Sequence, residues 1–200
     1  MFITFEGIDF SGKSTQAKLL FDYLKKKKKK VIFVREPGGT KLSEKIRKLL
    51  LDKKNDNMTY VSEFLLFSAS RNQLTNEVII PHLKKGYIVI CDRYFDSSTA
   101  YQGYGGKIEL KSLILVNKLA SASLTPERTY LLNISYKDSV KRKSKTGTDD
   151  RIEKRKEEYY NKVVKGYLEI AKLNKKRFRV LNATETKEKI FNKILQDLNI

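Results

Sequence analysis

The sequence predicts an α/β fold of three layers, in which helices cover both faces of a parallel β-sheet. Five short runs of mostly apolar residues begin at Phe2, Val31, Tyr87, Thr129 and Phe178. Their nearly continuous hydrophobicity is typical of strands that are buried on both faces. Longer stretches with helical spacing separate them, and this alternation predicts parallel strands joined by right-handed crossovers.

The strands and helices are expected at defined places along the chain. The apolar runs FITFEGI, VIFVR, YIVIC, TYLLNI and FRVL predict strands over residues 2–8, 31–35, 87–91, 129–134 and 178–181. The periodic stretches predict helices over residues 13–27, 42–51, 60–82, 110–122, 151–173 and 185–198. The polar, charged stretch KRKSKTGTDD, residues 141–150, lies between two helical patterns, and we expect an exposed, mobile loop there.

Size and composition fit one globular domain. The chain has 200 residues, of which 40% are apolar, and this is enough for a sizeable core. It contains one cysteine, Cys91, and one histidine, His82. A disulfide framework within the chain and a cysteine metal site are therefore excluded. A Ser-His-Asp or Cys-His mechanism is not expected either.

The chain is strongly basic. Its formal net charge is +19, which keeps nucleic acid and nucleotides among the candidate partners. The one dense block of charge, Lys25–Lys30, follows a predicted helix, where cations favour the helix C-terminus and need no ligand. Aromatic residues do not alternate with basic ones as a base-stacking surface requires. We therefore do not expect nucleic acid as a partner.

The chain opens directly in the first predicted strand, and no basic, apolar leader precedes it. No apolar run approaches the ~18 residues of a membrane span. We therefore expect a soluble, cytoplasmic protein without a membrane partner.

The stretch GIDFSGKST, Gly7–Thr15, lies between the first predicted strand and the first predicted helix. Its glycines, lysine and serine complete the pattern G-x-x-x-x-G-K-[ST], a P-loop whose backbone N–H groups hold phosphate oxygens. In this pattern the lysine reaches the β- and γ-phosphates and the serine holds Mg²⁺. The sequence therefore predicts a site for ATP with Mg²⁺. Its expected residues are Gly7, Ile8, Asp9, Phe10, Ser11, Gly12, Lys13, Ser14 and Thr15.

The third predicted strand is followed by Asp92 and Arg93. An acidic residue at this place holds the magnesium ion together with the P-loop serine, so Ser14 and Asp92 are the expected metal residues. Many P-loop motor ATPases have a glutamate next in the chain to activate water, whereas this chain has arginine. The sequence therefore favours transfer to a bound anionic acceptor over hydrolysis.

Arginines stand near the carboxyl ends of the predicted strands, although lysine dominates elsewhere. They are Arg35, Arg47, Arg71 and Arg93. The planar guanidinium group makes bidentate contacts to phosphate and to ring edges, which predicts a site for an acceptor phosphate. Phe67 and Arg71 share a helix face, where the ring could stack on a base while the arginine bonds to its edge. The spacing alone favours the other interpretation, with Phe67 in the core and Arg71 in solvent.

The chain resembles the bacterial thymidylate kinases over nearly its whole length. The resemblance is carried by the motifs FEGIDFSGKSTQ, REPGGTKLSEKIRKLLL, LLFSASRNQ, CDRYFDSSTAYQG and DDRIE. REPGGT together with DRYFDSSTAYQG is specific to this family among nucleoside monophosphate kinases. The resemblance implies phosphoryl transfer from ATP to dTMP, giving ADP and dTDP. It also implies a single domain over residues 1–200, a five-stranded parallel sheet of order 2-3-1-4-5, and a homodimer.

The resemblance further implies roles for residues at the acceptor site. Asp9 meets the 3′-hydroxyl of the acceptor sugar, and Arg47 and Arg93 hold the acceptor phosphate. Phe67 stacks on thymine, and Arg71 bonds to its carbonyl edge. The residues expected around the acceptor are Asp9, Glu36, Pro37, Arg47, Phe67, Arg71, Arg93, Ser97, Ser98, Tyr101 and Gln102. Among these, the tyrosine crowds the 2′ position and so favours deoxyribose.

The stretch KRKSKTGTDDRIE resembles the lid of the family, which we expect over about residues 141–151. A lid closes over the donor, excludes water and brings cations to the transferring phosphoryl group. Its expected cations are Arg142, Lys143, Lys145 and Arg151. Because Phe10 stands where some relatives have a catalytic arginine, the lid has to supply charge for the transition state. We expect the Phe10 ring to point away from the phosphates.

The transfer itself needs positioning and charge neutralisation, since an acceptor phosphate already carries a nucleophilic oxygen. The expected catalytic residues are Lys13, Asp92, Arg93 and Arg142. Two alternatives stay open. A related kinase would act on a deoxynucleoside or another monophosphate, although the arginines favour a monophosphate. A P-loop ATPase or nucleic-acid-binding protein would account for the basic charge, but the chain lacks the water-activating glutamate and any known nucleic-acid module.

Overall fold

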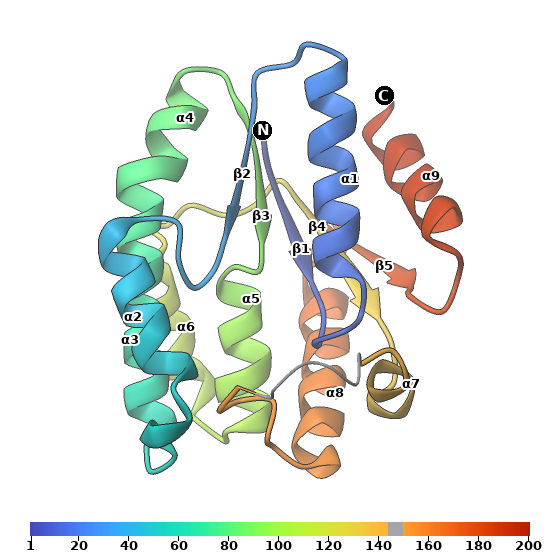
Figure 1. Cartoon of the computed structure of the whole chain (residues 1–200). Helices are drawn as coiled ribbons and strands as arrows, with labels where there is room; N and C mark the ends of the chain where they lie inside the picture. The colour runs from blue at the N-terminus through green and yellow to red at the C-terminus, as the bar shows by residue number, and fades with distance from the viewer. Residues whose placement is uncertain (144–149) are drawn as a thin grey trace.

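The five predicted strands form one parallel sheet (Figure 1). The computed structural model describes residues 1–143 and 150–200. Its strands are β1 (Phe2–Glu6), β2 (Val31–Arg35), β3 (Ile88–Asp92), β4 (Arg128–Asn133) and β5 (Phe178–Asn182). Their order across the sheet is β2-β3-β1-β4-β5, and each neighbouring pair is parallel. The predicted fold class and strand order are confirmed.

Helices connect the strands. They are α1 (Lys13–Lys26), α2 (Lys41–Leu51), α3 (Tyr60–Leu74), α4 (Ile80–Lys84), α5 (Phe95–Ser98), α6 (Leu110–Ala120), α7 (Tyr136–Lys141), α8 (Glu157–Leu173) and α9 (Lys187–Leu198). A 3₁₀ turn spans Lys53–Asn55, and π-helical turns span Thr75–Ile79 and Thr99–Gly105. α5 and α7 are not predicted, because elements of 4 and 6 residues are too short to show a helical period. None of the helices in the described ranges combines the length and apolar character that crossing a bilayer requires.

Residues 60–82, predicted as one helix, form two helices joined by a wider turn. α3 ends at Leu74, the π-helical turn follows, and α4 begins at Ile80. Pro81, in the first turn of α4, has no backbone N–H, and its ring crowds the carbonyl group one turn earlier. The wider turn before it makes room for the ring.

Residues 151–156, predicted as the start of a long helix, are not helical, and α8 begins at Glu157. The Asp150 carboxylate accepts hydrogen bonds from the backbone N–H groups of Ile152 and Glu153, at 2.8 and 2.9 Å. An aspartate turn of this kind competes with the hydrogen bonds of a helix. The prediction for these six positions is therefore wrong.

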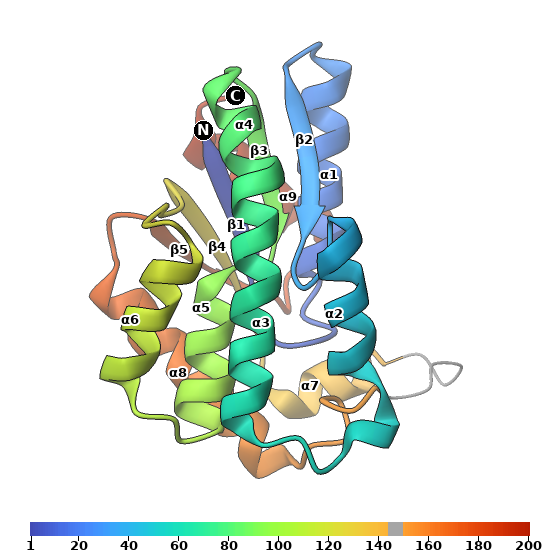
Figure 2. The same ribbon diagram turned by 90° about the vertical axis from the view of Figure 1, so that its left-hand side faces the viewer.

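Alternate side chains of the strands pack on the two faces of the sheet. Ile3 and Phe5 of β1 belong to a buried cluster with Leu20 of α1. Phe2 belongs to a second cluster with Leu74 of α3. Figure 1 shows α1 and α9 together on one side of the sheet, and Figure 2 shows α3 on the side turned to the viewer. The sheet is thus buried on both faces, as the hydrophobicity of its strands predicts.

The carboxyl ends of β1, β2 and β3 lie at one edge of the sheet. The P-loop follows β1, the glycine-containing turn of residues 36–40 follows β2, and Arg93 follows β3. Figure 1 shows this edge next to α5, α7 and α8. Open parallel sheets bind ligands along this edge. The fold therefore brings the three predicted motifs to one place.

Candidate active site

The P-loop turns tightly because two glycines adopt backbone angles that other residues disfavour. Gly7 has a φ of 138°, and a Cβ atom there would lie 2.7 Å from the carbonyl oxygen of Leu132. Gly12 has a φ of 93° and is the N-cap of α1, without a side-chain cap. The first N–H groups of α1 are thus left available to an anion.

A pocket lies over the P-loop, and we call it the donor pocket. From the loop and α1 it is lined by Asp9, Phe10, Ser11, Gly12, Lys13, Ser14, Thr15 and Gln16. Its remaining wall consists of Arg142, Glu153, Ala183, Glu185, Lys187 and Ile190. Of the residues predicted for ATP, only Gly7 and Ile8 are absent from this lining, and both are buried.

Ser14 and Asp92, the residues predicted to hold a metal ion, are in direct contact. The Ser14 hydroxyl donates a hydrogen bond to Asp92 Oδ2. Asp92 Oδ1 is buried and accepts no hydrogen bond from the residues that the structure describes. A buried oxygen of this kind is unfavourable until a ligand satisfies it. Hydroxyl and carboxylate oxygens suit Mg²⁺, which takes few protein ligands and completes its shell with phosphate and water. The residues present therefore fit this ion.

A second pocket lies beside the first, and we call it the acceptor pocket. The structure brings all of the predicted acceptor residues into its wall. These are Asp9, Glu36, Pro37, Arg47, Phe67, Arg71, Arg93, Ser97, Ser98, Tyr101 and Gln102, joined by Leu51, Tyr94, Asp150 and Ile152. Asp9 lines the donor pocket as well. The two pockets therefore meet at one carboxylate.

Asp9 lies between two cations. Arg93 Nη2 donates a hydrogen bond to its carboxylate at 2.6 Å, Lys13 Nζ does so at 3.5 Å, and the Tyr101 hydroxyl does so at 3.3 Å. Burial opposes the ionisation of Asp9, but the charges of Arg93 and Lys13 prevail and hold its pKa below the usual range. The carboxylate therefore stays ionised and balances the cations on both sides.

Arg93 is fixed by its backbone and by its side chain. Its φ is 71°, a conformation that costs a residue with a Cβ atom about 1–3 kcal/mol. Its Nη1 donates to the carbonyl oxygen of Gly7 at 2.9 Å, and its guanidinium carbon lies 5.0 Å from the centre of the Tyr101 ring. These contacts hold the Arg93 guanidinium group in the wall of the acceptor pocket.

The buried carboxylate of Glu6 positions Arg93 through two shared hydroxyl groups. Glu6, the last residue of β1, accepts hydrogen bonds from Ser97 Oγ at 2.6 Å and from the Tyr167 hydroxyl at 2.9 Å. Arg93 Nη1 lies 3.2 and 3.3 Å from the same two hydroxyls. Burial and repulsion from Asp96 raise the pKa of Glu6 to about 7, and the Ser97 hydrogen bond opposes this rise.

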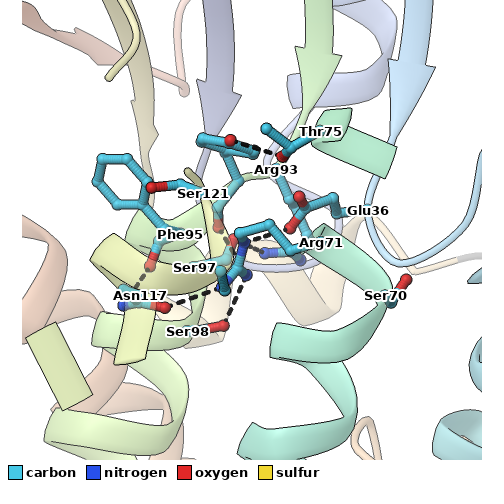
Figure 3. Close-up of polar contacts among 12 residues, drawn as sticks. Glu36, Ser70, Arg71, Thr75, Arg93, Phe95, Ser97, Ser98, Asn117 and Ser121 are labelled. Atoms are coloured by element: carbon cyan, nitrogen blue, oxygen red, sulfur yellow. Dashed lines mark hydrogen bonds and ion pairs between the residues drawn. The ribbon is translucent and has the colours of Figure 1, made fainter. Parts of the chain in front are cut away.

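Arg71 is held by side chains from three other parts of the fold (Figure 3). It is 1% exposed. Its Nε donates to Glu36, its Nη1 to Asn117 and its Nη2 to Ser98, each at 2.8 Å. The interpretation that Arg71 lies in solvent is therefore wrong. Phe67, one turn earlier and half-buried, lines the same pocket.

The two other predicted acceptor arginines differ in their placement. Arg47 of α2 lines the acceptor pocket and donates to the carbonyl oxygen of Pro37 at 2.9 Å. Burial and repulsion from Arg35 lower the pKa of Arg47, which an anion in the pocket would reverse. Arg35 itself is exposed, pairs with Glu44 at 3.2 Å and lies outside the pocket lining.

Of the predicted lid cations, Arg142 lines the donor pocket and Lys143 lies close to two residues of its wall, Phe10 and Glu153. Arg142 donates to the carbonyl oxygens of Ser11 and Ala183, at 3.4 and 2.5 Å. Its guanidinium group is therefore bound to the backbone on both sides of the pocket. Lys145 lies outside the described residues.

The second of these cations is Lys143. Its Nζ lies 5.7 Å from the centre of the Phe10 ring and 3.7 Å from the Glu153 carboxylate. Phe10 lines the donor pocket. The orientation of its ring relative to bound phosphates stays a prediction.

Arg151, the remaining predicted lid cation, is buried away from the P-loop. It is 7% exposed, forms an ion pair with Glu63 and donates from Nε to the carbonyl oxygen of Leu50 at 2.9 Å. It does not line the donor pocket. The structure thus places Arg151 as an anchor of the chain after residue 149, and the expectation that it faces the donor phosphates is corrected.

A family model described as thymidylate kinase matches residues 5–194. The chain belongs to the thymidylate kinase family. The thymidylate kinases of Sulfurihydrogenibium sp. and Thermosipho africanus are each 46% identical to it, over 92% and 97% of this chain and 89% and 95% of their own lengths. That of Symbiobacterium thermophilum is 41% identical over 95% of this chain and 88% of its own. The crystal structure of thymidylate kinase from Ehrlichia chaffeensis has a TM-score of 0.81 and 35% identity, covering 99% of this chain and 98% of that one.

Several residues that shape this thymidylate kinase site are not predicted from the sequence. They are Glu6, Glu63, Asn117 and Tyr167. The role of Glu6 could have been predicted from the sequence, because a charged residue in a strand that is buried on both faces needs a hydrogen-bonding partner. The role of Glu63 could not, since an acidic residue in the first turn of a helix is ordinary on a surface.

Replacing Glu6 by Gln should change how stability depends on pH. An acid whose pKa is raised from 4.5 to about 7 binds a proton in the folded state where the unfolded chain has lost it. The wild-type free energy of unfolding therefore falls by about 3 kcal/mol, through this group, as the pH rises from about 4.5 to 7. Urea unfolding between about pH 5 and 8 measures this fall. The free energy of unfolding of Glu6→Gln minus that of wild type should therefore rise with pH up to about pH 7 and stay constant above it.

The exposed Glu158→Gln is the matched control for this series. Its stability difference from wild type should stay small across the range. A Glu6→Gln difference that is the same at every pH would contradict the raised pKa.

Proposed function

We propose that this chain transfers the γ-phosphoryl group of ATP to dTMP, giving ADP and dTDP. The observation that carries the proposal is the pair of pockets that meet at Asp9. One lies over a P-loop, and the other is lined by Arg47, Arg71 and Arg93 together with Phe67. Membership of the thymidylate kinase family supports dTMP as the acceptor. We place the reaction in the cytoplasm, where ATP is made and used.

In the acceptor pocket, Phe67 stacks on the thymine ring and Arg71 donates to a carbonyl oxygen at its edge. Arg47 and Arg93 hold the phosphate. Their placement supports this division, because Arg93 contacts Asp9 next to the donor pocket, whereas Arg71 is bonded to Glu36. The phosphate end of the acceptor therefore faces the donor, and the base lies farther from it.

The sugar lies between these two ends. Asp9 meets its 3′-hydroxyl, and Tyr101 crowds the 2′ position, which favours deoxyribose. The hydroxyl of Tyr101 lies 3.3 Å from the Asp9 carboxylate. The two side chains can therefore contact neighbouring positions of one sugar.

On the donor side, Lys13 reaches the β- and γ-phosphates, and Ser14 and Asp92 hold Mg²⁺. The ion neutralises the oxygens of these phosphates when it is bound. Burial and repulsion from Arg93 lower the pKa of Lys13. Phosphate beside this ammonium group is therefore favoured, because it balances a buried charge.

The reaction needs positioning more than a strong base. An oxygen of the dTMP phosphate forms a bond to the γ-phosphorus, the bond to the β,γ-bridging oxygen breaks, and that oxygen leaves on ADP. Lys13 and Arg93, which both contact Asp9 Oδ1, hold the two phosphates toward each other. Both cations also balance the charge that spreads over the transferring group.

We propose the stretch of residues 141–151 as a lid over the donor. Arg142 lines the donor pocket, and Lys143 lies beside Phe10, which stands where some relatives have a catalytic arginine. Arg142 and Lys143 are therefore the residues that we assign to the donor phosphates, with Lys145 as a further candidate.

We propose that two copies of the chain associate through α3 and α6. Val61 and Leu65 of α3 and Ile114, Leu115 and Leu119 of α6 all expose more than half of their surface. Figure 2 shows both helices turned to the same side of the molecule. Apolar side chains gathered in this way mark a contact with a partner. A second copy of the chain covers them in this proposal.

The experiment that tests the function measures ADP formation from ATP and Mg²⁺ with a panel of acceptors. dTMP should raise the rate well above that with ATP alone. dUMP, UMP, CMP, AMP, GMP, thymidine and DNA should each give less. Absence of stimulation by dTMP would overturn the proposal, a higher rate with another acceptor would assign that acceptor, and stimulation by DNA alone would indicate a nucleic-acid-dependent ATPase.

Arg71→Ala should weaken dTMP binding far more than ATP binding. Removing a buried donor costs about 1–3 kcal/mol, which corresponds to roughly 5–150-fold in Kd. Titration calorimetry with each nucleotide measures the two affinities, and thermal unfolding confirms that the variant is folded. Arg35→Ala, at the exposed arginine, is the control and should change neither affinity. Equal losses for dTMP and ATP would contradict the role at the base edge.

Leu119→Glu should convert the dimer to single chains, because it buries a charge against apolar partners. Light scattering should give wild type twice the chain mass of 23.2 kDa, and the variant that mass once. Leu173→Glu is the matched control, since Leu173 is 81% exposed on α8. Wild-type protein that scatters as a single chain would refute the proposed association.

A further inference from the structure

The side chain of Glu63 is fully buried between the acceptor pocket and the chain after residue 149. It is 0% exposed. Its Oε1 accepts a hydrogen bond from Gln102 Nε2 at 2.8 Å. Its Oε2 accepts from Nη2 of both Arg151 and Arg155, the latter at 2.6 Å. One carboxylate thus binds an amide of the acceptor pocket on one side and two cations on the other.

Glu63 decides how the Gln102 amide is oriented. A carboxylate only accepts hydrogen bonds, so the amide nitrogen of Gln102 has to face it. Within residues 1–143 and 150–200, no group donates a hydrogen bond to Gln102 Oε1. Gln102 lines the acceptor pocket. Its carbonyl oxygen is therefore the group that is left for a ligand.

Arg71 and Gln102 then offer opposite hydrogen-bonding characters in one pocket. Arg71 presents N–H donors, whereas the Gln102 oxygen accepts. Thymine carries a carbonyl oxygen next to the imide N–H at N3, which matches this pair. Cytosine carries an amino group next to an unprotonated N3, which reverses it. The reversed base would leave polar groups buried and unpaired, and this is a strong basis for discrimination.

The two arginines connect the same carboxylate to a segment that forms part of both pockets. Asp150 and Ile152 line the acceptor pocket, and Glu153 lines the donor pocket. Arg151 and Arg155, on this segment, hold Glu63 Oε2. Removing the charge of Glu63 would therefore release the Gln102 amide, while the hydrogen bond from Arg151 Nε to the carbonyl oxygen of Leu50 still holds the segment.

We propose that Glu63 is a positioning residue for the acceptor base. It fixes the Gln102 amide so that its oxygen reads the imide N–H at N3, and Arg151 and Arg155 hold the carboxylate in place. The inference rests on the proposed function, since it takes a pyrimidine monophosphate as the acceptor. It makes the choice of base depend on a side chain that does not touch the nucleotide.

Glu63→Gln tests the proposal, because it keeps the shape of the side chain and removes its charge. An amide at position 63 can present its oxygen or its nitrogen to Gln102, so the Gln102 amide can turn over. The measured quantity is the ratio of kcat/KM for dTMP to kcat/KM for dCMP at saturating ATP. This ratio should fall by about tenfold or more. The KM for ATP should stay within about twofold.

Two further variants distinguish a positioning role of Glu63 from a nonspecific loss of activity. Glu158→Gln, an exposed glutamate of α8, should leave the ratio unchanged. Gln102→Met should lower it, and adding Glu63→Gln should lower it no further, because both changes act through one amide. A Glu63→Gln protein that loses activity equally with dTMP and dCMP would give Glu63 a structural role only and overturn the proposal.

Glu63→Asp takes the place of Glu63→Gln if thermal unfolding shows that the first variant is not folded. The shorter acid keeps the charge but cannot span the present distances to Gln102 and both arginines, so the ratio has to fall here too. An unchanged ratio in the folded variant overturns the proposal. Absence of dTMP phosphorylation by wild-type protein refutes the proposed function, whereas an active wild type with unchanged ratios refutes only the role of Glu63.

Discussion

The Asp9 carboxylate contacts the buried Lys13 and the half-buried Arg93, which line different pockets, and the rest of the site depends on this arrangement. Lys13 and Arg93 both contact it, so the two groups that we assign to the donor and acceptor phosphates lie close together. Without the negative charge of Asp9, the two cations would have to move apart, or Lys13 would have to lose a proton. The backbone is shaped for this contact, through the close packing at Gly7 and the positive φ of Arg93. The strain at Arg93 is thus offset by the charge balance that it makes possible.

Buried ion pairs recur through the molecule and define which elements meet. Arg177 binds the carboxylate of Asp96 through both of its terminal nitrogens, at 2.7 and 2.8 Å, and so joins the start of β5 to α5. Glu63 joins α3 to the chain after residue 149 in the same way. Such pairs add little net stability, because the cost of removing two charges from water offsets their attraction. Removing one partner is costly, however, and the pairs therefore exclude other arrangements of the same elements.

The sequence predicts the sheet and the motifs at its edge because these depend on local signals. Apolar runs identify the strands, and the motifs that follow them meet at the carboxyl edge of any parallel sheet. The residues that line the acceptor pocket were expected from the resemblance to the thymidylate kinases, whose motifs follow these strands. The role of Arg151 was not predicted, because it depends on Glu63, which is 88 positions away in the sequence and contacts Arg151 only in the folded chain. The start of α8 was also missed, since the aspartate turn at Asp150 and the ion pairs of Arg151 and Arg155 with Glu63 outweigh the helical pattern of residues 151–156.

Arg71 joins four elements of the fold while it serves the base in the proposed reaction. It lies on α3, and its partners follow β2 or belong to α5 and α6. A change at Arg71 that suits another base also leaves Glu36 buried without a counter-charge. A substitution at Arg71 that suits a new acceptor would thus destabilise the fold. Changes that restore stability elsewhere would have to come first. The preference for one base is in this way protected against evolutionary drift by the stability of the fold itself.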